Sequence, residues 1–242
     1  MSEIRVLDAG KIVQTVARLR DRVAERFPDS GLAQVAADLT VTAQETAARV
    51  AALSRPYLPL RVLAGAVVIL GVAAQIYVGR LVDWAAVLRR SDVVAISQGL
   101  DSAVNLLLLA FAAIWFVLTL EARWKRRAVL QRLYELRSFA HVIDMHQLTK
   151  DPTYPMIALS GGAPTASSPM RRLNEFELSR YLDYCTELLA LVAKLAALYA
   201  ARVQDPAVIT AVNEVEELTS DLGRKIWQKI MIISRLAEQP GP

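Results

Sequence analysis

Four polar side chains at helical spacing stand at the start of an apolar stretch, and their chemistry is that of a site that attracts ions. They are Gln98, Asp101, Ser102 and Asn105. Intervals of three and four residues place them on one face of a helix. The same face continues through Leu109, Ala112, Phe116 and Thr119. These eight residues are the predicted pore-lining set.

Assembly of several copies around an axis, with this face inward, would turn Asp101 into an acidic ring. Acidic rings attract cations, and an apolar constriction built by Leu109 and Phe116 can gate ions by dewetting. The same polar residues also have a purely structural explanation. Gln98 and Asp101 can cap a helix in the headgroup region, and Asn105 can contact a neighbouring helix. The sequence leaves both interpretations open.

Other residue types that carry chemistry do not form a recognisable site. His141, Asp144 and His146 are of types that bind metals, but on a helix His146 points about 160° away from Asp144. The glycine pair at 161–162 lacks the Lys-Ser/Thr of a phosphate-binding loop. The single cysteine, Cys185, excludes an internal disulfide. We therefore predict no metal, no cofactor and no catalytic residue, and interpret the chain as a protein that is not an enzyme.

A dense basic run follows the second apolar stretch. It consists of Arg123, Lys125, Arg126 and Arg127. Beside a membrane span such a run is attracted to anionic lipid headgroups, so we predict lipid contact for these four residues. This also explains the formal net charge of +4 without a nucleic-acid partner.

Two apolar stretches, residues 58–78 and 100–120, position all of these residues. Each is about 21 residues long, which is enough for a helix to cross a hydrocarbon layer of about 30 Å. Each has a single charged residue near its start, Arg61 in the first and Asp101 in the second. Hydrophobic residues make up 54% of the chain and charged residues 21%, so the apolar residues are concentrated. We predict an all-α membrane protein with a two-span transmembrane hairpin over residues 56–122 and the lipid bilayer as its first partner.

The positive charges also predict the orientation of the hairpin. Lys and Arg near span ends favour the cytoplasmic side, and the strongest cluster lies at 123–127. The loop between the stretches carries Arg80, Arg89 and Arg90, which weakens this preference without reversing it. Both termini are therefore predicted to be cytoplasmic. The Ala-, Arg- and Val-rich composition favours a bacterial source, and hence the bacterial inner membrane.

The remaining segments are predicted to be helical and cytoplasmic. Residues 1–55 hold two N-terminal helices, and 123–150 continue the second span as a helix. Residues 151–171 contain four prolines and two adjacent glycines, which is typical of a flexible linker. Residues 172–242 form two long amphipathic helices joined by a tight turn, an antiparallel helical hairpin. Asn174 with Glu177 predicts a capping box at the start, and Asp205-Pro206 predicts an N-cap followed by proline.

Two functional interpretations follow from these observations. The first is a small integral membrane protein that self-associates through its spans and cytoplasmic helices and forms an oligomeric ion channel or membrane effector. The alternative is a non-catalytic, membrane-anchored scaffold whose helical hairpin binds a cytoplasmic protein. The layout is similar to that of small bacterial two-span effector proteins, although no residue motif is shared. The copy number, any transported species and the identity of a partner do not follow from the sequence.

Overall fold

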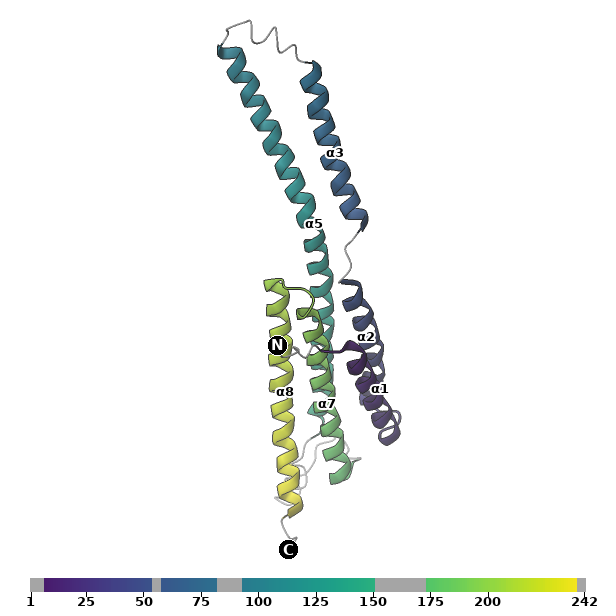
Figure 1. Cartoon of the computed structure of the whole chain (residues 1–242). Helices are drawn as coiled ribbons and strands as arrows, with labels where there is room; N and C mark the ends of the chain where they lie inside the picture. The colour runs from purple at the N-terminus through teal and green to yellow at the C-terminus, as the bar shows by residue number, and fades with distance from the viewer. Residues whose placement is uncertain (1–6, 54–57, 82–92, 151–172, 239–242) are drawn as a thin grey trace, which may run out of the picture. The chain divides into compact units, whose positions relative to one another are not determined.

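The computed structural model describes residues 7–53, 58–81, 93–150 and 173–238, and these residues form α-helices joined by short turns, with no strand among them. The helices are α1 (Ala9–Arg26), α2 (Gly31–Leu53), α3 (Leu58–Leu81), α5 (Val93–Leu148), α7 (Glu175–Ala200) and α8 (Pro206–Glu238) (Figure 1). The predicted all-α class is therefore confirmed. The chain divides into two compact units, which we call unit 1 (Met1–Ser54 with Ala128–Pro242) and unit 2 (Arg55–Arg127).

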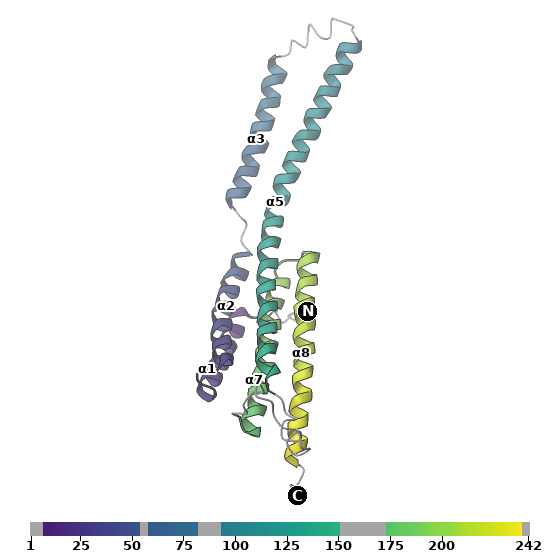
Figure 2. The ribbon, with the colours of Figure 1, turned by 180° about the vertical axis from the view of Figure 1, so that it is seen from behind.

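Unit 1 is a helical bundle with one continuous apolar core. The core is built from α1, α2, the part of α5 after residue 127, α7 and α8. Two pairs of consecutive helices lie side by side in both views, α1 with α2 and α7 with α8 (Figures 1 and 2). The apolar stripe expected on the later part of α5 is buried: Val129, Leu133, Leu136, Ala140 and Ile143.

Helix α7 is the central element of unit 1, because it is buried on two faces. One face carries residues at intervals of three and four, among them Leu182, Cys185 and Leu189. The second carries Tyr184, Leu191 and Leu198, at intervals of seven. Helix α8 packs along α7, and α1 and α2 contact it as well. A helix that is apolar on more than one side is typical of the interior of a bundle.

Local side-chain chemistry explains where the helices of unit 1 begin. Asp8 caps α1, since its Oδ1 accepts from the amides of Gly10 and Lys11 at 2.8 and 3.2 Å. At the start of α7 the predicted capping box is present. Asn174 Oδ1 accepts from the Glu177 amide at 2.8 Å, and the Glu177 carboxylate accepts from the Asn174 amide at 2.9 Å. Both interactions satisfy amides that have no partner within the helix.

Polar contacts between helices define the two ends of unit 1. At one end, the hydroxyl of Tyr199 near the end of α7 lies 3.5 Å from the hydroxyl of Thr46 in α2. Arg132, early in the unit 1 part of α5, lies 3.5 Å from Glu45 of α2. At the other end, Lys229 of α8 donates to the Gln147 side chain at 2.6 Å. The chain therefore leaves unit 1, after α2, and re-enters it, through α5, at the end that also holds the turn between α7 and α8.

Unit 2 consists of α3 and the first part of α5. Its described apolar side chains are mostly exposed, in contrast to the core of unit 1. Helix α5 is continuous from Val93 to Leu148, so the segment predicted at 100–120 and the helix predicted after it form one element. The predicted linker at 151–171 lies outside the described residues, as does most of the loop between the two apolar stretches.

Candidate functional site

All eight predicted pore-lining residues lie in α5. The side chains of Asp101, Asn105, Leu109, Ala112 and Phe116 are exposed. Thr119 is half-buried, and its hydroxyl donates to the Phe116 carbonyl at 3.0 Å. The side chains of Gln98 and Ser102 are outside the described part of the structure. A continuous helix carries the polar stripe as expected, whereas the pore itself stays a prediction.

The apolar residues around this stripe are also exposed. Leu109 is 68% exposed and Phe116 55%, and the same holds for neighbours on other sides of the helix. These neighbours include Leu107, Leu108, Phe111 and Trp115. Among the described helices, α5 alone is long and apolar enough to cross a membrane. Helix α3 contains a shorter apolar run, Gly65–Ala74, so the first predicted span stays a prediction.

The predicted headgroup-binding residues also lie on α5, directly after the predicted second span. Arg123, Arg126 and Arg127 are exposed, and Lys125 forms an ion pair of 2.8 Å with Glu121 one turn earlier. The guanidinium of Arg123 lies 6.0 Å from the centre of the Phe116 ring. Three exposed guanidiniums in one and a half turns of helix give a local positive surface that suits phosphate groups.

The three potential metal ligands near the end of α5 do not converge. His141 is exposed, Asp144 accepts a hydrogen bond of 2.6 Å from Gln147, and the His146 ring lies against Gly31 at the start of α2. No group of three His, Cys, Asp or Glu residues suited to a metal occurs in the described ranges. Burial, and secondarily the charge of Lys150, lowers the pKa of His146. This ring therefore acts as a neutral packing group at neutral pH.

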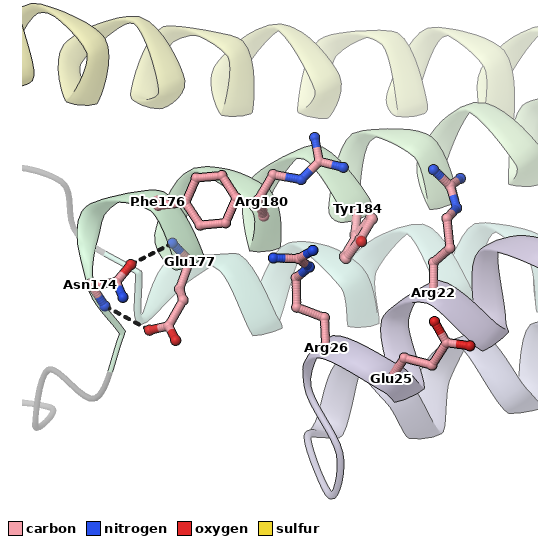
Figure 3. Close-up of a pocket in the computed structure, with 8 residues that line it drawn as sticks. All are labelled: Arg22, Glu25, Arg26, Asn174, Phe176, Glu177, Arg180 and Tyr184. Atoms are coloured by element: carbon pink, nitrogen blue, oxygen red, sulfur yellow. Dashed lines mark hydrogen bonds between the residues drawn. The ribbon is translucent and has the colours of Figure 1, made fainter.

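Unit 1 contains a pocket that sequence reasoning missed, with a cavity volume of about 560 Å³ (Figure 3). It lies between the end of α1 and the start of α7. Three arginines and two aromatic rings dominate its lining. The guanidinium of Arg26 lies 5.4 Å from the Phe176 ring centre, and those of Arg22 and Arg180 lie 5.7 and 5.3 Å from the Tyr184 ring centre. The rings hold the guanidinium groups in place by cation–π contacts.

The charges of this pocket are mixed rather than purely basic. Arg22 is paired with Glu187, and Arg180 lies 3.1 Å from Asp183. Glu25 and Glu177 also line the cavity. Because carboxylates nearly balance the guanidiniums, the pocket does not form a strong anion site. The Arg22–Glu187 ion pair instead links α1 to α7. No local sequence pattern predicts this pocket, because Arg22 and Glu187 lie 165 residues apart.

A second hollow runs along the surface between α7 and α8, with a volume of about 520 Å³. Its lining is made mainly of small residues: Thr186, Ala190, Ala193, Thr219, Ser220 and Gly223. Lys194, Arg224 and Trp227 complete it. The indole of Trp227 is 57% exposed, and a Cβ added at Gly223 would meet no atom within 4 Å. We call this surface the α7–α8 groove.

Cys185, the single cysteine of the chain, is buried and unreactive. Burial raises the pKa of the Cys185 thiol to about 12, so the reactive thiolate is not populated at neutral pH. Burial also raises the pKa of Tyr181.

In comparisons with known proteins, no family model, no curated protein and no solved structure matches the chain.

Proposed function

We propose that this chain is an integral membrane protein that self-associates and forms an oligomeric ion channel or related membrane effector. The observation that carries the proposal is the exposed apolar surface of α5 between Leu107 and Phe116. Burying one large apolar side chain is worth about 1.5–3 kcal/mol, so six of them in water would cost on the order of 10 kcal/mol. A bilayer, or the same helix in other copies, removes this cost.

The polar stripe of α5 favours contact between copies of the chain over a helix surrounded by lipid alone. Asp101 and Asn105 are exposed on the single chain. A carboxylate or amide facing hydrocarbon is strongly disfavoured, so such residues turn toward protein or a water-filled cavity. Gly65 and Gly71 of α3 have no neighbour within 4 Å of an added Cβ, which leaves room for close approach of another helix. An assembly with the Asp101 face inward would remove the polar side chains of α5 from hydrocarbon and would let another helix pack against the glycines of α3.

Conductance in planar bilayers tests the channel directly. With assembly verified, Asp101→Asn should reduce the preference for cations, because it removes the acidic ring and keeps the side-chain size. Leu109→Ser should increase conductance, because a polar constriction stays wetted. Leu108→Ser is the matched control, since Leu108 is equally apolar and exposed but lies about 100° away around the helix. Absence of conductance from both the parent and Leu109→Ser would refute the channel.

A membrane-anchored scaffold is the second candidate. The α7–α8 groove favours it, because it presents the exposed Trp227 together with Arg224, and these two residue types are enriched among those that dominate the energy of protein–protein contacts. A scaffold predicts no conductance and no effect of Asp101→Asn. In either case we propose that both termini lie in the cytoplasm, on the grounds of the basic residues at 123–127. The Ala-, Arg- and Val-rich composition supports a bacterial inner-membrane location.

A further inference from the structure

The outward face of α5 in unit 1 carries a stripe of residues at the spacing of a helix-pairing surface. Its members, which we call the outer stripe, are Gln131, Tyr134, Ser138, His141, Met145 and Leu148, and all six are exposed. Tyr134 and Met145 are 64% exposed and Leu148 is 62% exposed. Intervals of three and four residues alternate along the stripe, as they do where one helix presents a seam to another. The outer stripe lies about 150° around the helix from the buried face of α5, so it takes no part in the core of unit 1.

The outer stripe differs from other outer surfaces of unit 1 in its charge. None of its members is Asp, Glu, Lys or Arg, although 21% of the chain is charged. Charged residues at its margins are paired within unit 1: Arg137 with Glu214 at 3.2 Å, and Glu135 with Arg132 at 2.7 Å. Depletion of charge together with exposed aromatic and methionine side chains is typical of the central part of a protein–protein interface.

A contact between two copies in the same orientation requires such a surface. In a parallel pair whose helices are in register, each residue meets its own counterpart in the other copy. A charged residue would then face a like charge, which is repulsive. The outer surface of α8 fails this condition, because it exposes five charged residues within ten positions: Glu216, Glu217, Asp221, Arg224 and Lys225. The outer stripe meets the condition, so it suits a second copy of the chain.

The place of the outer stripe on α5 supplies the orientation of the copies. Among the described helices, α5 is the one long and apolar enough to cross a membrane. Copies inserted in one bilayer with the same orientation therefore have parallel α5 helices.

The outer stripe also repeats the spacing of the predicted pore-lining set. Five of its members follow pore-lining residues by 36 positions, and those residues are Gln98, Ser102, Asn105, Leu109 and Ala112. Because 36 residues are ten turns of an α-helix, and α5 is continuous from Val93 to Leu148, both sets belong to one face of this helix. A contact between copies along the first set is therefore continued by the second.

We propose that the outer stripe binds the outer stripe of another copy, parallel and in register, so that assembly along α5 continues beyond the membrane. This inference rests on the proposed insertion of α5 into a bilayer, and it identifies the surface through which the part outside the membrane self-associates. Tyr134, Met145 and Leu148 of one copy pack against the same residues of the other. Their apolar surface is thereby removed from water, which favours the contact.

Cysteine cross-linking of the full-length chain in membranes tests the surface. In Ser138→Cys the new thiols of two copies face each other, so a short bifunctional thiol reagent should yield a covalent dimer. The native Cys185 is buried and does not compete. Ser220→Cys is the matched control, because Ser220 is also an exposed serine of unit 1 but lies on the outer surface of α8. We expect efficient cross-linking of the first variant and little of the second.

Mixed copies test the parallel register. Gln131 and Met145 lie seven residues before and after Ser138, which places them about 21 Å apart along the helix. Gln131→Cys and Met145→Cys should each cross-link to copies of their own kind. When the two variants are co-expressed with tags of different size, the mixed product should be nearly absent. An antiparallel pair centred on Ser138 would instead join position 131 to position 145.

A charge introduced into the outer stripe tests whether like residues meet. In the Ser138→Cys background, Met145→Glu places two carboxylates opposite each other and should reduce the dimer yield roughly tenfold. Met231→Glu is the matched control, because Met231 is an exposed methionine on α8. Co-expressed Met145→Glu and Met145→Lys copies should form the mixed dimer in preference to either dimer of like copies. Circular dichroism should show parent-like helix content for each variant, since both methionines are exposed.

Three results would overturn the proposal. The first is a Ser138→Cys yield no higher than that of Ser220→Cys. The second is a mixed product of Gln131→Cys and Met145→Cys as abundant as the products of like copies. The third is equal dimer yields from Met145→Glu and Met231→Glu. The channel is measured separately, by conductance of the parent. Conductance without a Ser138→Cys dimer would refute this contact alone, and the dimer without conductance would refute the channel alone.

Discussion

Replacing Gly31 by alanine should destabilise unit 1 through one identifiable contact. A Cβ at position 31 would overlap Cε1 of His146 and lie 3.0 Å from its Nδ1 and 3.1 Å from its Nε2. Overpacking of this kind costs about 1–3 kcal/mol, because a side chain must leave its preferred position. Alanine in a helix regains up to about 1 kcal/mol relative to glycine. The net expected loss is about 1 kcal/mol, and it arises where the start of α2 meets α5.

Thermal unfolding of the full-length chain, followed by circular dichroism, measures this loss. For a unit of this size 1 kcal/mol corresponds to about 2–4 °C in Tm. The double variant Gly31→Ala with His146→Ala removes the overlap, so the two substitutions should couple by about 1–2 kcal/mol. Gly223→Ala is the control, because its Cβ meets no atom and should leave Tm unchanged or raise it. Parent-like stability of Gly31→Ala, or simple additivity in the double variant, would refute the reasoning.

Two further predictions concern pH and orientation. Burial lowers the pKa of His146 below its usual value of 6.5, so as the pH falls the unfolded chain binds a proton at this ring before the folded chain does. The free energy of unfolding is therefore unaffected by His146 above about pH 6.5 and decreases as the pH falls below it. The Tm of the parent should fall more between about pH 7.5 and about pH 5.5 than that of His146→Asn, and equal falls would contradict the assignment. For orientation, a membrane-impermeant thiol reagent on intact cells should label Ser91→Cys and not Thr210→Cys, with the reverse pattern excluding cytoplasmic termini.

Much of unit 1 follows from periodicity alone. The stripe through Val129, Leu136 and Ile143 predicts the buried face of α5, and the one through Val212, Leu222 and Ile226 predicts that of α8. Long apolar side chains at helical intervals lie on one face of a helix, and this face is buried because its exposure to water is unfavourable. The predictable part of the fold is therefore the set of helices and the face that each one buries.

The sequence is less informative where small residues or distant partners are involved. Ala36, Thr40 and Ala43 of α2 are buried, but alanine and threonine give no clear apolar stripe. The second buried face of α7, with Tyr184, is overlooked for a different reason. The first face is enough for a two-helix hairpin, and the second is buried because α1 packs against it: the Phe27 ring centre lies 6.1 Å from that of Tyr184.

The candidate sites divide in the same way. The polar stripe on α5 is local, so its spacing could be read from the chain. The arginine–aromatic pocket is lined by residues of α1 and α7, and the α7–α8 groove by residues of two helices. Both depend on the folded bundle, which periodicity does not specify.

The two buried faces of α7 have a consequence for how this protein can change. Thirteen of the 26 residues of α7 are buried, and they touch a core shared with every other helix of unit 1. A substitution there disturbs several neighbours at once, so few replacements are compatible with folding. The outer surface of α8 has no such restriction in a single chain. In a comprehensive mutational scan, α7 should therefore be the least tolerant segment for abundance. Intolerance along the outer surface of α8 would instead mark selection for contact with another molecule.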